Sequence, residues 1–263
     1  MNSEFRSTRF PGHDIRLLMG FLAICFVVFA QSIFAQDREH VAFEFEGGAL
    51  WQTRNDVRIP NATGTEFSIV DSVGKGPYGV FRIEAAFDLN EKHGFRIVVA
   101  PLEINDTAVF DQSISFAGEQ FDPGVSAEAN YRFSSYRFTY RYRFYNGSTW
   151  NWKIGFTGFV RDARIALRQG NTYAEDTDVG FVPLAHLRGE ARLTDQWRFL
   201  LDFEGMGAPQ GRAFDIAAKI ARKLSDRWEL ALGYRTIEGG ADVERVYNFA
   251  WLHFAVGSIR LRF

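Results

Sequence analysis

Ionisable side chains occupy alternate positions in two segments of the chain. His186, Arg188, Glu190 and Arg192 lie in residues 179–192, and Asp202 and Glu204 end residues 197–204. Alternate residues of an extended strand share one face, so the members of each set are close to one another. A histidine near a carboxylate can act as a general base. The candidates for acid–base chemistry are therefore His186 with Glu190, and the carboxylate pair Asp202 and Glu204, which we place near the rim of the fold.

Neither candidate pair is accompanied by the partners that catalysis requires. No nucleophile is grouped with them, and the histidines at positions 40, 93, 186 and 253 contain no His-x-x-x-His spacing for a metal. The only cysteine, Cys25, lies in an apolar run near the N-terminus. We therefore expect these charges to pair with one another, with no catalytic site, no metal site and no cofactor.

The segments that would carry these residues alternate between apolar and polar side chains. In residues 135–144, Tyr136, Phe138, Tyr140, Tyr142 and Phe144 alternate with Ser135, Arg137, Thr139, Arg141 and Arg143. In water, such a sheet would expose a row of aromatic side chains and aggregate. In a membrane barrel, one face meets lipid and the other meets the lumen. The pattern predicts strands between lipid and water.

Ten such strands are predicted between short turns and longer connections. They cover roughly residues 40–51, 77–89, 95–105, 125–144, 150–167, 179–192, 197–204, 213–223, 228–237 and 246–263. The Ala-rich segment 213–223 would also form an amphipathic helix, but a strand there preserves the order of hairpins. Longer loops are expected at 52–76, 106–124, 168–178, 205–212 and 238–245. The fold class is an all-β transmembrane antiparallel up-and-down barrel of about ten strands, with eight or twelve as alternatives.

The N-terminal segment has the composition of a secretory signal peptide. Arginines at positions 6, 9 and 16 precede the apolar run 17–30, and Ala35 follows as a small residue suited to cleavage. We predict a signal peptide over residues 1–35, with Ala30 as the alternative cleavage point, and a barrel domain over residues 36–263. The apolar run is too short to span a bilayer comfortably as a helix.

The C-terminus resembles the assembly signal of Gram-negative outer-membrane β-barrels, whose final strand ends in phenylalanine. Ile259, Leu261 and Phe263 share one face of the last predicted strand. The resemblance implies an integral outer-membrane protein that contacts lipid and lipopolysaccharide and is inserted by the barrel-assembly machinery. Five tryptophans are placed to form aromatic girdles at the two membrane interfaces: Trp51, Trp152, Trp197, Trp228 and Trp251.

The predicted lumen is rich in charge of both signs. Its charge cluster comprises Arg137, Arg141, Arg143, His186, Arg188, Glu190, Asp202 and Glu204. Ten strands leave a lumen little wider than the side chains that fill it, so we expect a narrow or plugged barrel acting as a structural or surface protein or small pore. We expect a monomer. The formal net charge of −2 gives no reason to expect binding to nucleic acid.

Two other classes of function remain open. The strand number resembles that of the omptin surface proteases, but no Asp-x-His motif is present. The lipid-facing His-x-Ser of small lipid A deacylases is not reproduced at His253, which Phe254 and Ala255 follow. An outer-membrane protease or lipid A hydrolase is the first alternative. A binding or adhesion barrel is the second, using acidic extracellular loops such as residues 106–124.

Overall fold

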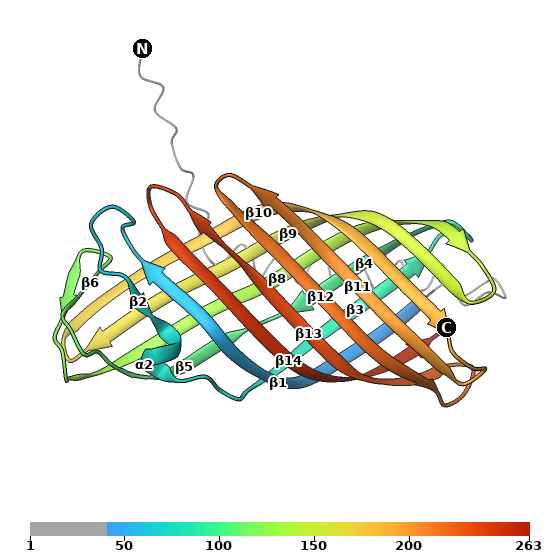
Figure 1. Ribbon diagram of the computed structural model, residues 1–263, viewed down its shortest axis with the longest axis horizontal. Helices are drawn as coiled ribbons and strands as arrows, with labels where there is room; N and C mark the ends of the chain where they lie inside the picture. The colour runs from blue at the N-terminus through green and yellow to red at the C-terminus, as the bar shows by residue number, and fades with distance from the viewer. Residues whose placement is uncertain (1–40) are drawn as a thin grey trace, which may run out of the picture. The chain divides into compact units, whose positions relative to one another are not determined.

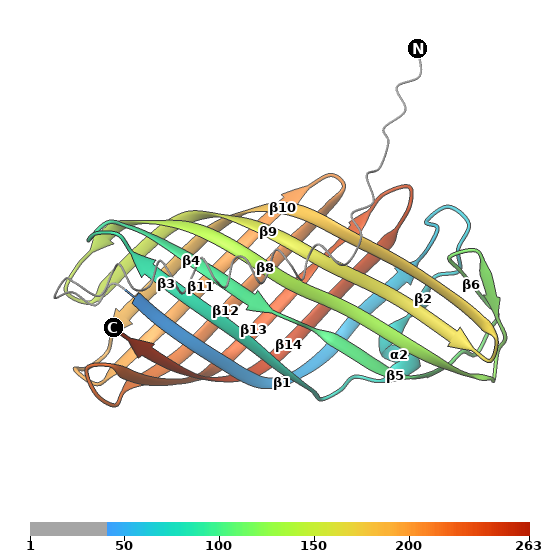
Figure 2. The ribbon, with the colours of Figure 1, turned by 180° about the vertical axis from the view of Figure 1, so that it is seen from behind.

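The computed structural model describes residues 41–263, so the signal peptide predicted over residues 1–35 lies outside the described residues. Most of the described chain forms one antiparallel sheet that closes into a barrel, and residues 114–121 form a separate two-stranded sheet (Figures 1 and 2). Closure comes from the pairing of the first strand with the last, from Ala42 opposite Arg262 to Arg58 opposite Tyr247, with one shift of register between Gln52 and Arg54. No helix within residues 41–263 has the length and apolar character needed to cross a membrane.

Each strand of the barrel pairs with its neighbours in sequence, as an up-and-down topology requires. The main strands are β1 (Val41–Arg58), β3 (Tyr78–Asp88), β4 (His93–Ala100), β5 (Glu103–Val109), β8 (Ser126–Asn146), β9 (Trp150–Gln169), β10 (Thr172–Arg192), β11 (Trp197–Ala208), β12 (Gly211–Lys223), β13 (Trp228–Asp242) and β14 (Tyr247–Arg262). The short elements are β2 (Phe67–Ser68), helix α2 (Ile69–Val73) and the hairpin β6 (Ile114–Phe116) with β7 (Glu119–Phe121). The barrel has ten strands if β4 and β5 are counted as one interrupted strand, which confirms the predicted fold class and number.

The two ends of the barrel differ, and we name them by their connections. The turn end carries Val41, Phe263 and the short turns at 89–92, 147–149, 193–196 and 224–227. The loop end carries the connections at 59–77, 110–125, 170–171, 209–210 and 243–246. The Ala-rich segment is strand β12, as predicted, and not a helix.

Four predicted loops are wrong in extent because strands continue through them. Residues 168–178 belong mostly to β9 and β10, which are joined by a turn in which Gly170 has a positive φ of 58°. Strand β1 continues to Arg58, and residues 205–212 and 238–245 are largely strand. The predicted strand 95–105 is instead broken at Pro101, which has no backbone N–H to donate to a sheet.

Outward and inward faces follow the predicted alternation. Phe81, Phe138 and Phe156 are about half exposed on the outer surface, whereas Arg96, Arg137 and Arg141 are buried inside. At the loop end, β5, β8, β9 and β10 extend beyond this apolar outer surface, beside α2 and the β6–β7 hairpin (Figure 1). The outside of the barrel therefore differs along its length: an apolar surface surrounds one part of the lumen, and strands that extend beyond this surface surround the part at the loop end.

Candidate functional site

The predicted charge cluster lies inside the barrel, and most of it is deeply buried. Arg96 is fully buried on β4 and is the centre of one group of contacts. Its guanidinium binds Glu204, contacts Asp202 at 2.8 Å and Glu84 at 3.5 Å, and donates to Nδ1 of His186 at 3.3 Å. Hydroxyl groups complete the surroundings of Glu204, since Thr157 donates to it at 2.6 Å.

A second group of contacts is centred on Asp215, a carboxylate that is 4% exposed on β12. Three arginines converge on it: Arg235 at 2.6 Å, Arg137 at 2.7 Å and Arg82 at 3.3 Å. Arg137 also binds Glu204 and therefore links the two groups. The alternation did not single out Asp215, because it lies in the Ala-rich segment whose strand character was itself in question.

Further ion pairs continue toward the turn end. Glu44 and Glu46 on β1 both bind Lys219, and Arg260 binds Glu44 from β14. Other pairs in this part of the barrel include Arg188–Glu190, Arg198–Glu190, Arg198–Glu229, Arg262–Glu229, Arg141–Asp88 and Lys153–Asp88. Breaking a buried pair leaves an uncompensated charge. Loss of one ionic side chain should therefore destabilise the partners that it leaves in the interior.

The two candidate pairs for acid–base chemistry are not arranged as expected. Glu190 is held by Arg188 and Arg198, and the carboxylate nearest to His186 is that of Glu204, at 3.6 Å. Asp202 and Glu204 do not lie at the rim; Glu204 is 1% exposed in the interior and is bound by two arginines. These residues form ion pairs in the interior of the barrel.

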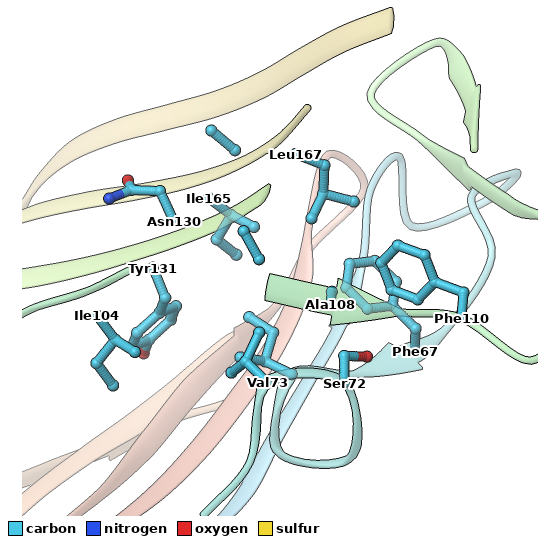
Figure 3. A pocket seen from close by; sticks show the side chains of 13 residues that line it. Phe67, Ser72, Val73, Ile104, Ala108, Phe110, Asn130, Tyr131, Ile165 and Leu167 are labelled. Atoms are coloured by element: carbon cyan, nitrogen blue, oxygen red, sulfur yellow. The ribbon is translucent and has the colours of Figure 1, made fainter. Parts of the chain in front are cut away.

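The loop end of the lumen is filled by apolar side chains. Leu50, Val57, Ile104, Ile165 and Leu167 point inward from three strands, and β2, α2 and the β6–β7 hairpin cover them. Figure 3 shows the small pocket left under α2, where side chains from α2, β5, β8 and β9 face one another. Phe67 packs edge to face on Phe110, with ring centroids 5.5 Å apart. The acids predicted for loop 106–124 are exposed on the outside of this cover.

The predicted girdle residues lie on the outer surface near the two ends. Trp51 and Trp251 flank the loop end, Trp197 and Trp228 follow turns at the opposite end, and Trp152 stacks on Trp150 at 5.0 Å. The terminal Phe263 exchanges backbone hydrogen bonds with Val41, which places the predicted assembly signal at the seam where the barrel closes. Arg143, the last member of the predicted cluster, is half-buried beside a bulge in β8.

His253 lies on the outer surface beside two hydroxyl groups that sequence spacing did not link to it. Nε2 of His253 is 2.9 Å from the hydroxyl of Thr53, and its Nδ1 is hydrogen-bonded to the hydroxyl of Tyr234. Thr53 is the extra residue of a β-bulge between Gln52 and Arg54. We call Thr53, His253 and Tyr234 the outward histidine trio. Because its members come from three strands, no linear motif reveals it.

Within residues 41–263, no three histidine, aspartate or glutamate side chains are grouped as they would be around a metal ion. The clustered carboxylates of the lumen are bound to arginine and lysine instead.

Comparison with known proteins identifies the fold. No protein-family model and no curated protein sequence matches the chain. The outer-membrane protease OmpT of Escherichia coli matches with a TM-score of 0.52 at 7% identity, over 87% of this chain and 99% of that chain. The β domain of the Bordetella autotransporter BrkA matches at 0.45, with 14% identity over 86% of this chain and 100% of that one. The Pseudomonas putida toluene transporter TodX matches at 0.35, with 10% identity over 86% and 90%. The chain has the fold of an outer-membrane β-barrel protein.

Proposed function

We propose that the protein is an integral outer-membrane β-barrel with a closed lumen, which acts as a structural or surface protein and does not conduct ions. The turn end would face the periplasm and the loop end the outside of the cell. The observation that carries the proposal is the filling of the lumen along its length, by ion pairs in one half and apolar side chains in the other. A barrel filled in this way offers ions no continuous water path.

Membrane integration is supported by the outer surface. Its exposed side chains include Phe81, Phe138, Phe181 and Leu232, and such a surface is stable in lipid but not in water. A closed barrel also satisfies its backbone hydrogen bonds internally. The purified protein should therefore migrate faster on an SDS gel before boiling than after it, and native protein recovered from the soluble periplasmic fraction would contradict the proposal.

The closed lumen is tested in a planar bilayer. The unmodified protein should give no steady current, because the ion pairs of Arg96 and Arg137 with Glu204 fill the lumen inside the barrel wall. Large and steady conductance from protein that has passed the gel test would replace the closed barrel with a pore.

Removal of Phe263 should reduce insertion into the outer membrane if this residue is recognised by the assembly machinery.

A lipid-ester hydrolase is the second candidate function, and the outward histidine trio is the observation that favours it. A hydroxyl group 2.9 Å from an imidazole has the geometry of a nucleophile beside a general base. Tyr234 occupies the place of the orienting group on Nδ1. The trio faces the outer leaflet in the proposed orientation, beside Trp51 and Trp251, where lipid ester bonds would be found.

The two candidates differ in what His253→Asn and Thr53→Val do to membrane lipids. The structural proposal expects the lipid A and phospholipid composition of cells to be the same for wild type and both variants. Thr236→Val is the matched control, since Thr236 is a neighbouring outer hydroxyl that binds the indole of Trp251 and not the histidine. A deacylated product that disappears in both trio variants but persists in the control would establish the hydrolase.

A further inference from the structure

The wall of the barrel is interrupted beside β3. This strand pairs with β1 over Tyr78–Phe87, but it pairs with β4 only from Ile83, opposite Val99, toward the turn end. Beyond Ala100 the chain continues as β5, which pairs with β8 alone among the described strands. Residues 78–82 and 103–109 therefore face each other across an interval with no strand pairing.

Helix α2 covers only the part of this interruption that is nearer to the loop end. It contacts both β1 and β5, and Gln52 fixes its C-terminal end by donating to the carbonyl of Gly74 at 2.8 Å. On the turn-end side of α2, where β3 and β4 separate, lies a small pocket of about 40 Å³ that is partly open to the outside. Its apolar lining includes Val80, Phe81, Ala100, Pro101, Leu102 and Phe133.

The inner lining of the same pocket is cationic. Arg82, Arg137 and Arg235 contribute to it, with Glu46 as the only acid among the lining residues. Asp215 binds a terminal guanidinium nitrogen of Arg82, and Asp215 and Glu204 both bind a terminal nitrogen of Arg137. The Nε atoms of Arg82 and Arg137, side chains that are 6% and 4% exposed, have no hydrogen-bond partner among the described residues. Unpaired buried donors carry a free-energy cost that an acceptor would relieve.

The opening lies within the apolar outer surface. Phe81 is 47% exposed and stacks on Phe45, with ring centroids 6.3 Å apart. Both lie on the turn-end side of the girdle residue Trp51 along the paired strands β1 and β3. If the barrel is inserted as proposed above, the pocket is entered from the hydrocarbon region of the membrane and not from water.

We propose that this lateral pocket binds the carboxylate end of a long-chain fatty-acid-type amphiphile, which enters from the membrane through the interval beyond the last β3–β4 pair. The first carbons of its chain would lie along Val80, Ala100 and Leu102, and its carboxylate would accept hydrogen bonds from Arg82 and Arg137. The proposal rests on the proposed insertion in a membrane, and it assigns a binding role to the interruption in the barrel wall and to the two arginines behind it.

The test uses a diazirine-bearing palmitate in liposomes that contain the full-length protein. After irradiation, the labelled peptides are identified by mass spectrometry. We expect labelling of the pocket segments 78–82 and 100–102 to exceed labelling of the general outer surface, such as Phe181 and Leu232, by roughly tenfold, as a charge-assisted contact would produce. The same chain carrying a primary alcohol in place of the carboxylate should label the pocket no more than the general outer surface.

Two pairs of variants separate the headgroup from the chain. Arg82→Met removes one donor but leaves Asp215 with Arg137 and Arg235, and Arg198→Met is its control because Glu190 and Glu229 likewise keep other arginines. Ala100→Trp fills the pocket, and Ala255→Trp places the same side chain on the exposed outer face of β14. Pocket labelling should fall roughly tenfold in the first member of each pair and stay unchanged in the second.

Each other outcome overturns the site. Equal labelling of pocket and outer surface would show ordinary lipid contact with no binding pocket. Equal labelling by acid and alcohol would show that the arginines do not recognise a carboxylate. If labelling is lacking even on the general outer surface, the membrane insertion of the barrel fails together with the pocket, and this result is distinct from the first two.

Discussion

The two halves of the lumen are filled by opposite chemistry. Toward the turn end, carboxylates and cations interlock around Glu204 and Asp215. Toward the loop end, Leu50, Ile104 and Leu167 form an apolar core under a cover of short elements. Interior polarity in each half is the reverse of exterior polarity. Where the outside is apolar the inside is charged, and where the outside is polar the inside is apolar.

Strand β9 shows this reversal within one continuous element. Ile154, Phe156 and Val160 are exposed on the outer face of its first half. In its second half, Ile165 and Leu167 are buried on the inner face, while the outward Arg164 donates to Tyr173 at 3.0 Å. Side-chain parity does not change along the strand. The change of polarity near residues 160–162 therefore indicates where the strand leaves the proposed membrane and continues as an ordinary water-soluble sheet.

The largest expected effect comes from removing the acid at the centre of the charged half. Asp215→Ala leaves Arg82, Arg137 and Arg235 buried around a lost carboxylate. Breaking a buried pair of this kind costs about 3–5 kcal/mol. We expect the temperature at which the barrel unfolds in SDS to fall strongly, as followed by the gel shift.

The matched control is Asp111→Ala, which removes an exposed acid at the loop end and should leave that temperature unchanged. If both variants unfold at the same temperature as the wild type, the ion pairs of the charged half do not contribute to stability. The stability of the barrel would then reside in its strand pairing and apolar core.

The apolar half is tested by Phe116→Ala, and its effect should be smaller and local. Phe116 is fully buried and packs edge to face on Phe67, with ring centroids 5.9 Å apart. Loss of such a ring costs about 3 kcal/mol where the site cannot collapse. Because the β6–β7 hairpin is a cover and not part of the barrel wall, residues 111–124 should become sensitive to protease while the unfolding temperature stays near that of wild type. Cooperative unfolding of the whole barrel in this variant would show that the two halves are coupled.

The sequence predicts the charged half well, because the outer aromatic rows make the alternation visible. Ten strands, their inner and outer faces and the buried Arg137, Arg141 and Arg188 all follow from it. The sequence does not predict which carboxylate pairs with which arginine, because the side chains pair across the lumen. Arg96, for example, binds Glu204, which is 108 residues away in the sequence.

The apolar half is predicted poorly, and for a physical reason. Its outward residues are polar, so segments such as 168–178 have loop composition although they are strand. The wall interruption beside β3 is also hidden, since Pro101 indicates only a break in one strand and not the failure of β3 and β5 to pair. The outward histidine trio needs a bulge at Thr53 that no periodic pattern shows.

The smallest expected effect is at the exposed turn between β12 and β13, which provides the contrast to the buried network. The Lys223 ammonium, 2.7 Å from the carboxylate of Asp226, lowers the pKa of that carboxyl. A carboxyl with a lowered pKa stabilises the fold above its unfolded pKa, and this contribution disappears as the pH falls through the lowered value. Because Asp226 is fully exposed, solvent screens the pair. Asp226→Asn and Lys223→Met should therefore give the same unfolding temperature as wild type at neutral pH, and superposable profiles from about pH 5 to about pH 2. An effect approaching that of Asp215→Ala would mean that charge pairing stabilises this barrel regardless of burial, and the distinction drawn between its interior and its surface would be wrong.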